Sequence, residues 1–426
     1  MKRGISMYIN RNIEEKVVEL SKQFPVLMIT GARQVGKSTL LNYINNLKEE
    51  KVTYVSLDKI QNRILAVEDP ELFLETYKPP VIIDEFQYAP DLLSYVKIKV
   101  DEARLDEMFN NGKSVETLYY LTGSQSFLTM EKASETLAGR VGIIDLYGLS
   151  NRELNGLKSR PFIPEIEALR KEEVTTKYNT VQELYKRIFK GSYPEIYKNE
   201  DISLENYFDS YVKTYIERDI RKLINITDEI KFMKFMVSVA ARTGQELNIT
   251  EIANDAEISS TTANDWLSIL KNTGLIVLLE PYTQNVIKRV VKRPKLYFMD
   301  TGLACYLTKY PSAEVLEASA YSGHIFETFV ISEIIKSFTN NGMDAKRYLY
   351  YYRDNNGHEI DLIIDYNNKL YPIEIKKSKN PGHDAIKNFY VLNDLKKEIA
   401  ACVVLCMADS IFPIDAYNYL VPIKYI

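Results

Sequence analysis

One stretch decides the fold: Gly31-Ala32-Arg33-Gln34-Val35-Gly36-Lys37-Ser38, which matches the phosphate-binding pattern G-x-x-x-x-G-K-[ST]. The apolar run 25–30 before it predicts a buried strand, and residues 38–43 after it predict the start of a helix. Glycines let the backbone turn tightly, so that its N–H groups can surround a phosphate, and the helix N-terminus adds partial positive charge. This order of strand, loop and helix predicts a site for a nucleoside triphosphate.

Two polar residues of this loop have separate expected roles. Lys37 is expected to reach the β- and γ-phosphates, and the Ser38 hydroxyl is expected to ligate Mg²⁺. The full set of expected nucleotide contacts is Gly31, Ala32, Arg33, Gln34, Val35, Gly36, Lys37, Ser38 and Thr39.

A second apolar run ends in two acids. Residues 81–83 are Val-Ile-Ile, and Asp84 and Glu85 follow directly. At the end of a buried strand, Asp84 is positioned to complete the Mg²⁺ shell, and Glu85 to polarise the attacking water as general base. Taken alone, the pair is equally compatible with a strand that enters a polar turn. Its combination with the phosphate loop favours the catalytic interpretation.

Composition limits the function classes. The chain has 426 residues, of which 46% are apolar, so we expect two to four domains with full cores. The 54 basic and 58 acidic residues give a net charge of −4, so any contact with nucleic acid must be local. No apolar run approaches the roughly 18–20 residues of a membrane span, and no signal peptide is visible. We expect a cytoplasmic protein without a membrane partner.

The three cysteines are Cys305, Cys402 and Cys406. The last two lie in the apolar run 399–406, which predicts buried thiols rather than zinc ligands.

The first part of the chain, residues 1–150, alternates strand and helix patterns. Near-continuous apolar strands separated by helices predict an α/β fold with a parallel sheet, whose ligands bind at the carboxyl ends of the strands. The predicted strands after the loop are 52–58, 81–84, 118–124 and 142–146. Residues 151–245 lose the strand pattern, and their helical periodicity predicts a helical lid.

Residues 246–298 have the pattern of a winged helix. Helices are predicted at 250–256 and 261–273, and the strand 275–279 follows Gly274. The run 286–295 is expected to supply wing strands. Its five cations are Lys288, Arg289, Lys292, Arg293 and Lys295. Two interpretations remain open: DNA contact through the second helix and the wing, or a packing module whose cationic hairpin is only solvated.

Residues 299–426 carry a second constellation. A helix is predicted at 324–336 and strands at 348–353, 359–364 and 370–376. On these strands Asp361, Glu374 and Lys376 form the pattern of a metal-dependent nuclease, in which two carboxylates hold Mg²⁺ and the lysine orients the attacking hydroxide. Glu327 on the helix is a candidate third ligand. The alternatives are an exposed hairpin of alternating charge, and a nuclease fold that is inactive or used only for binding.

These segments together resemble a known family. One set of motifs lies in the first 150 residues and resembles the prokaryotic AAA+ superfamily ATPases of the archaeal-ATPase type. A second set lies in residues 299–426 and resembles the uncharacterised C-terminal domain that accompanies these ATPases, whose pattern is similar to restriction-endonuclease-like folds. The first set is Gly31 to Ser38, Val81 to Gln87, Leu121 to Gln125 and Leu137 to Arg140. The second set is Phe326-Glu327, Gly357 to Asp361 and Ile373 to Lys376.

The resemblance implies roles for two further residues. Ser124 occupies the place of the polar sensor near the γ-phosphate, where such ATPases more often have Asn. Arg140 is implied as an arginine finger, which would act on a neighbouring subunit and so requires a homo-oligomer. A salt bridge within the subunit is the alternative for Arg140.

Taken together, the sequence predicts a P-loop AAA+ core at 1–150, a helical lid, a winged helix, and a restriction-endonuclease-like α/β domain at 299–426. The expected ligands are ATP and Mg²⁺, and the expected reaction is ATP hydrolysis. Two outputs remain open: a nucleotide-gated nuclease or DNA-processing enzyme, and a signalling or scaffold ATPase whose C-terminal domain binds protein or nucleic acid without cutting.

Overall fold

The structure is a computed structural model of the chain, and it describes all residues except 1–7, 110–115, 124–134, 177, 179, 200, 216–228 and 284–291. The chain divides into two compact units. The N-terminal unit is Met1–Gly148 with Asn272–Gly274, and the C-terminal unit is Leu149–Lys271 with Leu275–Ile426. Ser124, Lys288 and Arg289 lie outside the described residues, so their roles stay predictions.

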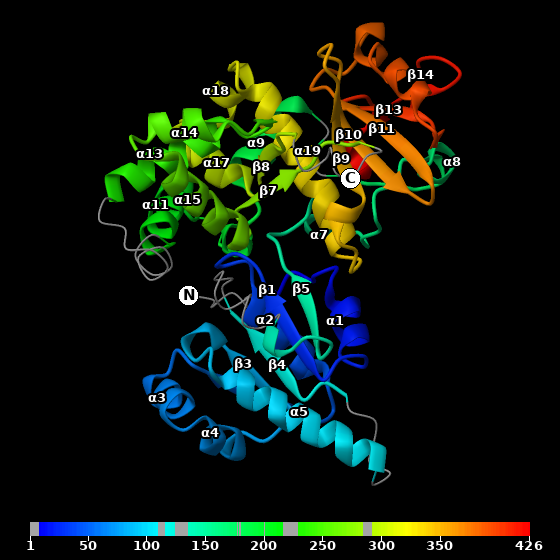
Figure 1. Ribbon diagram of the computed structural model, residues 1–426. Helices are drawn as coiled ribbons and strands as arrows, with labels where there is room; N and C mark the ends of the chain where they lie inside the picture. Colours follow the sequence, from blue (N-terminus) through cyan, green and yellow to red (C-terminus); the bar gives the residue numbers. More distant parts are fainter. Residues whose placement is uncertain are drawn as a thin grey trace. The chain divides into compact units, whose positions relative to one another are not determined.

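The N-terminal unit is built on a five-stranded sheet in the order β2-β3-β4-β1-β5, and its paired strands all run parallel (Figure 1). This confirms the predicted parallel α/β core. The strands are β1 (Val26–Thr30), β2 (Thr53–Ser56), β3 (Val81–Asp84), β4 (Tyr119–Thr122) and β5 (Val141–Asp145). The helices are α1 (Glu14–Leu20), α2 (Lys37–Leu47), α3 (Ile60–Glu68), α4 (Pro70–Thr76) and α5 (Leu92–Phe109).

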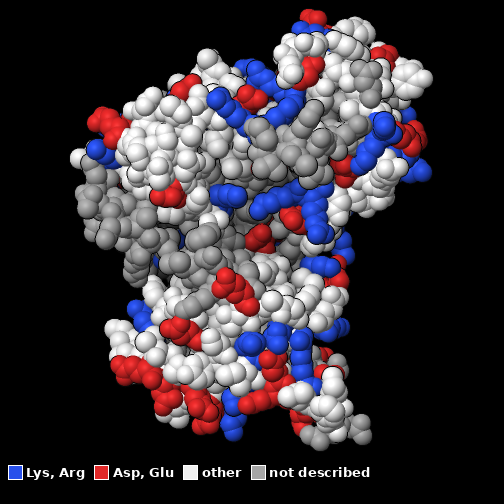
Figure 2. Space-filling model, in the orientation of Figure 1, with Lys and Arg blue, Asp and Glu red and all other residues white. Residues whose placement is uncertain are grey.

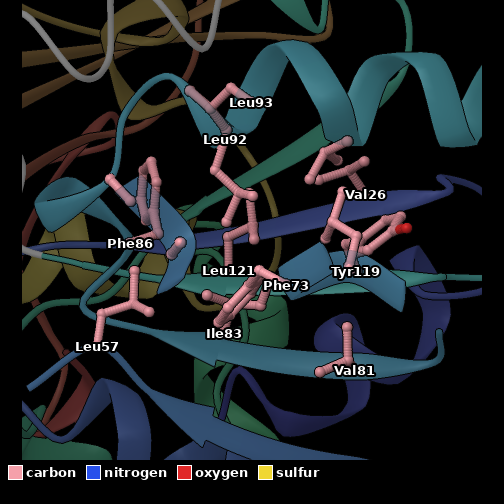
Figure 3. Packing of buried hydrophobic residues seen from close by; sticks show 14 of the residues in the cluster. Val26, Leu57, Phe73, Val81, Ile83, Phe86, Leu92, Leu93, Tyr119 and Leu121 are labelled. Carbon is pink, nitrogen blue, oxygen red and sulfur yellow. The ribbon is translucent and has the colours of Figure 1, made fainter. Parts of the chain in front are cut away.

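Alternate strand residues form one continuous core on the face covered by α4 and α5. Figure 3 shows Leu92 and Leu93 of α5 facing Leu121 of β4, with Phe73 of α4 packed beside them. Side chains of a strand alternate between faces, so Leu27 and Ile29 of β1 lie on the opposite face. Both are also fully buried. Burial of both faces explains why these strands read as continuous apolar runs.

Acidic side chains crowd one end of the N-terminal unit. Figure 2 shows them around the end where α3 and α4 lie, and the exposed acids there are Glu68, Asp69, Glu71 and Glu75. This surface would repel a phosphate backbone. Any contact with nucleic acid therefore has to come from other elements.

Helices dominate the first part of the C-terminal unit. The predicted helices at 250–256 and 261–273 appear as α14 and α15, and a three-stranded antiparallel sheet in the order β6-β8-β7 accompanies them. Most of the predicted wing lies outside the described residues, so the winged helix stays a prediction. The elements are α7 (Asn151–Leu154), α8 (Ile166–Arg170), α9 (Val181–Lys190), α10 (Pro194–Lys198), α11 (Leu204–Tyr215), α13 (Glu229–Ala241), β6 (Gln245–Glu246), α14 (Ile249–Asp255), α15 (Ser260–Asn272), β7 (Ile276–Leu279) and β8 (Lys295–Phe298).

A mixed seven-stranded sheet follows, in the order β14-β15-β13-β11-β10-β9, with β12 paired to β11. The hairpins β9-β10 and β10-β11 are antiparallel, whereas β11, β13 and β15 run parallel. The elements are α17 (Thr301–Leu307), α18 (Ala313–Ala318), α19 (Ser322–Thr339), β9 (Leu349–Arg353), β10 (Glu359–Tyr366), β11 (Lys369–Ile375), β12 (Glu398–Ile399), β13 (Cys402–Cys406), β14 (Phe412–Pro413) and β15 (Asn418–Pro422).

The two sheets of the C-terminal unit meet at Tyr351 of β9. The Tyr351 N–H donates to the Glu280 carbonyl at 3.1 Å, and the Tyr282 N–H donates to the Tyr351 carbonyl at 2.6 Å. The segment that leaves β7 is therefore hydrogen-bonded to β9, which joins the three-stranded sheet to the seven-stranded one.

A buried ion cluster fixes the start of the C-terminal unit. One carboxylate oxygen of Glu333 on α19 lies 3.4 Å from the Arg187 guanidinium and 3.0 Å from Lys336 Nζ. The other accepts a 2.6 Å hydrogen bond from the Asn151 N–H. Removing one member of such a set leaves a buried charge unpaired, so the cluster holds residues 149–151 firmly onto α19.

Cys402 and Cys406 are buried free thiols, as predicted, and Cys305 is a buried free thiol as well. Within the described ranges, no helix is both long enough and apolar enough to cross a membrane.

Candidate nucleotide site and carboxylate cluster

Two glycines shape the loop between β1 and α2. Gly31 has a φ of 138°, and a Cβ added there would lie 2.1 Å from the carbonyl oxygen of Leu146. Gly36 has a φ of 97° and forms the N-cap of α2. Only glycine adopts these conformations without strain, so the loop is tight because of both residues.

Lys37 lies inside the loop. Its side chain is buried, and Nζ donates to the carbonyl oxygens of Gly31 at 2.9 Å and Ala32 at 2.8 Å. The ammonium group is thereby held within the turn that the sequence predicts to surround a phosphate.

Asp84 collects three hydroxyl groups at the carboxyl end of β3. Ser38 Oγ donates to Oδ1 at 2.8 Å, Tyr54 OH donates to Oδ2 at 2.5 Å, and Thr122 Oγ1 also donates to Oδ1. Burial, and then the hydrogen bond to Asp84, raise the pKa of Tyr54, so its hydroxyl keeps its proton. Mg²⁺ takes oxygen ligands and often binds through one or two carboxylates, so the Ser38–Asp84 pair has the chemistry of a magnesium site.

Glu85 follows Asp84 in a left-handed conformation with a φ of 58°. Such backbone strain in a non-glycine residue is concentrated at functional sites. The Glu85 carboxylate accepts a hydrogen bond from Gln87 Nε2. Burial raises the pKa of Glu85, while Gln87, Lys37 and Arg33 oppose the rise. The predicted general base is therefore a partly buried carboxyl in the field of Lys37.

Arg140 makes an ion pair within its own unit. Its Nε lies 2.6 Å from Asp101 Oδ1, and its Nη2 donates to Asp101 Oδ2 at 3.0 Å. Nη1 donates to the Ala138 carbonyl at 2.9 Å. This is the arrangement that the sequence left open as the alternative to an arginine finger, and the role between subunits stays a prediction.

Sequence reasoning missed Arg11, Tyr54 and Thr122. Arg11 is buried, and its guanidinium donates to the carbonyls of Val35 at 2.9 Å and Tyr147 at 2.7 Å, so it supports the phosphate loop from behind. No local pattern singles out this arginine. Thr122 had a usable signal, because it is a polar residue within the predicted strand 118–124.

The C-terminal acids come together on neighbouring strands. Asp361 of β10 accepts a 2.8 Å hydrogen bond from the Ile375 N–H, and Lys376 Nζ lies 2.7 Å from Glu374 and 3.6 Å from Asp361. Burial, and then Asp361, raise the pKa of Glu374 to about 9. The structure thus brings together the three residues of the predicted nuclease pattern.

Glu327 and Lys295 complete a group that we call the carboxylate cluster. Glu327 Oε1 lies 3.1 Å from Lys295 Nζ and accepts a 2.6 Å hydrogen bond from Tyr297 OH. Burial, and then Asp361, raise the pKa of Glu327 to about 7. The cluster comprises Glu327, Glu359, Asp361, Glu374, Lys295 and Lys376.

The position of Lys295 corrects the sequence analysis, which counted it among the wing cations. Its side chain is only 3% exposed, because β8 turns it into the unit rather than toward solvent. A buried lysine cannot neutralise a DNA phosphate, so Lys295 is not a DNA contact.

The metal roles of the acids remain predictions. No three His, Cys, Asp or Glu side chains among the described residues are arranged to hold a metal ion together. Asp361 and Glu374 still supply carboxylate oxygens of the kind that Mg²⁺ binds in ones or twos.

Three family models match parts of the chain. Residues 23–155 match a model described as an AAA domain, and residues 181–314 and 322–426 match two models described as domains of unknown function. The first match spans all five strands of the N-terminal sheet. These residues therefore form an AAA-type domain with a P-loop.

Relatives extend over most of the chain. Uncharacterised proteins of Mycobacterium bovis and Mycobacterium tuberculosis are each 28% identical over 361 residues, which is 84% of this chain and 71% of theirs.

Similar solved structures include the Walker-type ATPase of Pyrococcus abyssi, which is 15% identical with a TM-score of 0.38. The match covers 70% of this chain and 96% of that protein. Another is the ORC2 protein of Aeropyrum pernix, which is 14% identical with a TM-score of 0.31. This match covers 71% of this chain and 92% of that protein.

The hydrogen bonds from Arg11 to the carbonyls of Val35 and Tyr147 can be tested by substitution. Arg11→Met should leave the carbonyls of Val35 and Tyr147 without their donor, at a cost of about 1–3 kcal/mol of unfolding free energy. We expect a lower denaturation midpoint and weaker binding of a fluorescent ATP analogue. Lys16→Met, which breaks only a surface ion pair with Glu19, is the control and should change both by little. Equal behaviour of the two variants would show that Arg11 does not support the loop.

Proposed function

We propose that the N-terminal unit binds and hydrolyses ATP with Mg²⁺. One observation supports this above all: Lys37, Ser38 and Asp84 meet at the carboxyl ends of β1 and β3. Ligands of parallel α/β sheets bind at this edge. The AAA-type match over residues 23–155 agrees with it.

Each residue has a defined task in this proposal. The N–H groups of residues 31–38 bind the phosphates, and Lys37 exchanges its loop carbonyls for β- and γ-phosphate oxygens. Ser38 and Asp84 hold Mg²⁺, which neutralises charge that develops on the phosphates. Glu85 takes the proton of the water that attacks the γ-phosphate in line. Tyr54 and Thr122 orient the Asp84 carboxylate.

Two substitutions separate binding from hydrolysis. Lys37→Ala should abolish ATP turnover, because the phosphates lose their cation. Glu85→Gln should keep ATP affinity within a few fold but lower the turnover number by roughly 10²–10⁴-fold, the usual contribution of a general base. Phosphate release and nucleotide binding measure the two effects.

Lys99→Ala is the control for both variants, because Lys99 only pairs with Glu102 on the surface of α5. Undiminished turnover in Lys37→Ala would contradict the mechanism.

We further propose that the ATP state is coupled to a DNA-binding or nuclease-like C-terminal domain. The convergence of Asp361, Glu374 and Lys376 supports a site there. Helix α19 offers a physical link. It carries Glu327 of the carboxylate cluster and, about two turns later, Glu333, which binds the backbone of Asn151 just after the N-terminal unit.

A signalling or scaffold ATPase is the alternative. The buried Lys295 favours it, because three of the acids already have a cation as partner. The net charge of −4 also favours a partner other than DNA.

A plasmid assay separates the two outputs. With Mg²⁺ or Mn²⁺, a nuclease should cut or nick plasmid, the rate should change with ATP, and Asp361→Ala should abolish the cutting. Lys397→Ala is the control. Lys397 pairs with Asp365, which lies on β10 like Asp361 but outside the carboxylate cluster. Intact plasmid under every condition, with DNA retained in a shift assay, would support the binding-only function.

A further inference from the structure

Lys295 is the most enclosed charge of the carboxylate cluster. Its Nζ lies 2.6 Å from Glu359, 3.1 Å from Glu327 and 3.9 Å from Asp361. The ammonium also lies 5.7 Å from the centre of the Tyr351 ring. A lysine buried to this extent persists only when acids neutralise it, so these contacts are required by the fold.

The lysine comes from a different sheet than two of its partners. Lys295 begins β8 of the three-stranded sheet, whereas Glu359 and Asp361 lie on β10 of the seven-stranded sheet, and Glu327 lies on α19. The backbone hydrogen bonds at Tyr351 join the two sheets nearby. The acids on β10 and α19 are thus held together by a cation that neither element supplies.

The cluster has more acids than cations. Its four carboxyl groups face two lysines, Lys295 and Lys376, so the acids outnumber the cations. Arg353 reaches Glu359 at 3.5 Å, but it also pairs with Glu246 at 3.2 Å, so it adds little to this balance.

We propose that Lys295 is a positioning residue of the C-terminal site. It acts as a built-in counter-cation that assembles Glu327, Glu359 and Asp361 and limits how strongly the cluster attracts a divalent cation. The inference rests on the proposed metal site at Asp361 and Glu374. It adds that this site is complete only when β8 of the neighbouring sheet is docked.

Two consequences follow from the electrostatics. Without Lys295, the acids repel one another and the unit is less stable when no divalent cation is present. With Mn²⁺ present, the variant without Lys295 gains more stability than the natural chain, because the acids attract the ion more strongly once this positive charge is removed.

The test is thermal unfolding of the full chain without nucleotide, in EDTA and in Mn²⁺. In EDTA, Lys295→Met should lower the Tm by on the order of 5 °C or more, and Mn²⁺ should recover much of this loss. The natural chain should gain less from Mn²⁺. Lys397→Met, which removes a lysine from the partly buried pair with Asp365 outside the cluster, should lower the Tm less and gain nothing extra from Mn²⁺. Equal Mn²⁺ shifts in Lys295→Met and the natural chain would overturn the proposal.

Glu359→Gln provides a second, independent variant. Combined with Lys295→Met, it removes one acid and one cation, so the double variant should lose less Tm than the two single losses added together. Alone, it should reduce the Mn²⁺ shift, because the cluster loses one of its carboxylates. If Lys295→Met does not fold, this single variant decides, and an unchanged Mn²⁺ shift would overturn the proposal.

Asp361→Asn separates this inference from the function on which it rests. A full Mn²⁺ shift in Asp361→Asn would refute the metal site itself. Loss of the shift in Asp361→Asn, together with unchanged behaviour in the Lys295 and Glu359 variants, would refute only the role of Lys295.

Discussion

The parallel register of β1, β3 and β4 is the constraint on which the nucleotide site depends. It pairs Asp84 with Thr122 and brings the end of β1, where the phosphate loop begins, to the same edge of the sheet. Gly31 can follow β1 directly only because it has no Cβ to meet the Leu146 carbonyl. The site is therefore a product of backbone geometry first, and the side chains of Lys37 and Ser38 act within a frame that the sheet defines.

Buried charge organises the C-terminal unit in a comparable way. Glu333 with Arg187 and Lys336 fixes residues 149–151, and Lys295 fixes the acids of the carboxylate cluster. A buried ion pair adds little net stability relative to apolar packing, but it strongly disfavours arrangements that leave one partner alone. Such pairs specify which elements dock together. Helix α19 takes part in both groups, which makes it the natural element to carry a change from one to the other.

Sequence reasoning succeeded where local patterns determine structure. Short-range periodicity and turn chemistry predict the apolar run that ends in Asp84, the loop from Gly31 to Ser38, and the helices α14 and α15. They also predict a strand at 118–124, which the structure has at Tyr119–Thr122. It failed where tertiary packing decides. Lys295 reads as one cation in a basic wing, because nothing in its neighbours reveals that β8 turns it toward acids on β10 and α19. Arg11 is similar, since its acceptors Val35 and Tyr147 lie far along the chain.

Isothermal titration calorimetry of the purified full-length chain with ATP and Mg²⁺ tests the central claim most directly. Phosphates held by the loop N–H groups, Lys37 and the Ser38–Asp84 pair predict saturable binding at one site per chain, weakened when EDTA removes Mg²⁺. No detectable heat with either ATP or GTP, in a sample whose fold is verified by circular dichroism, would contradict the account.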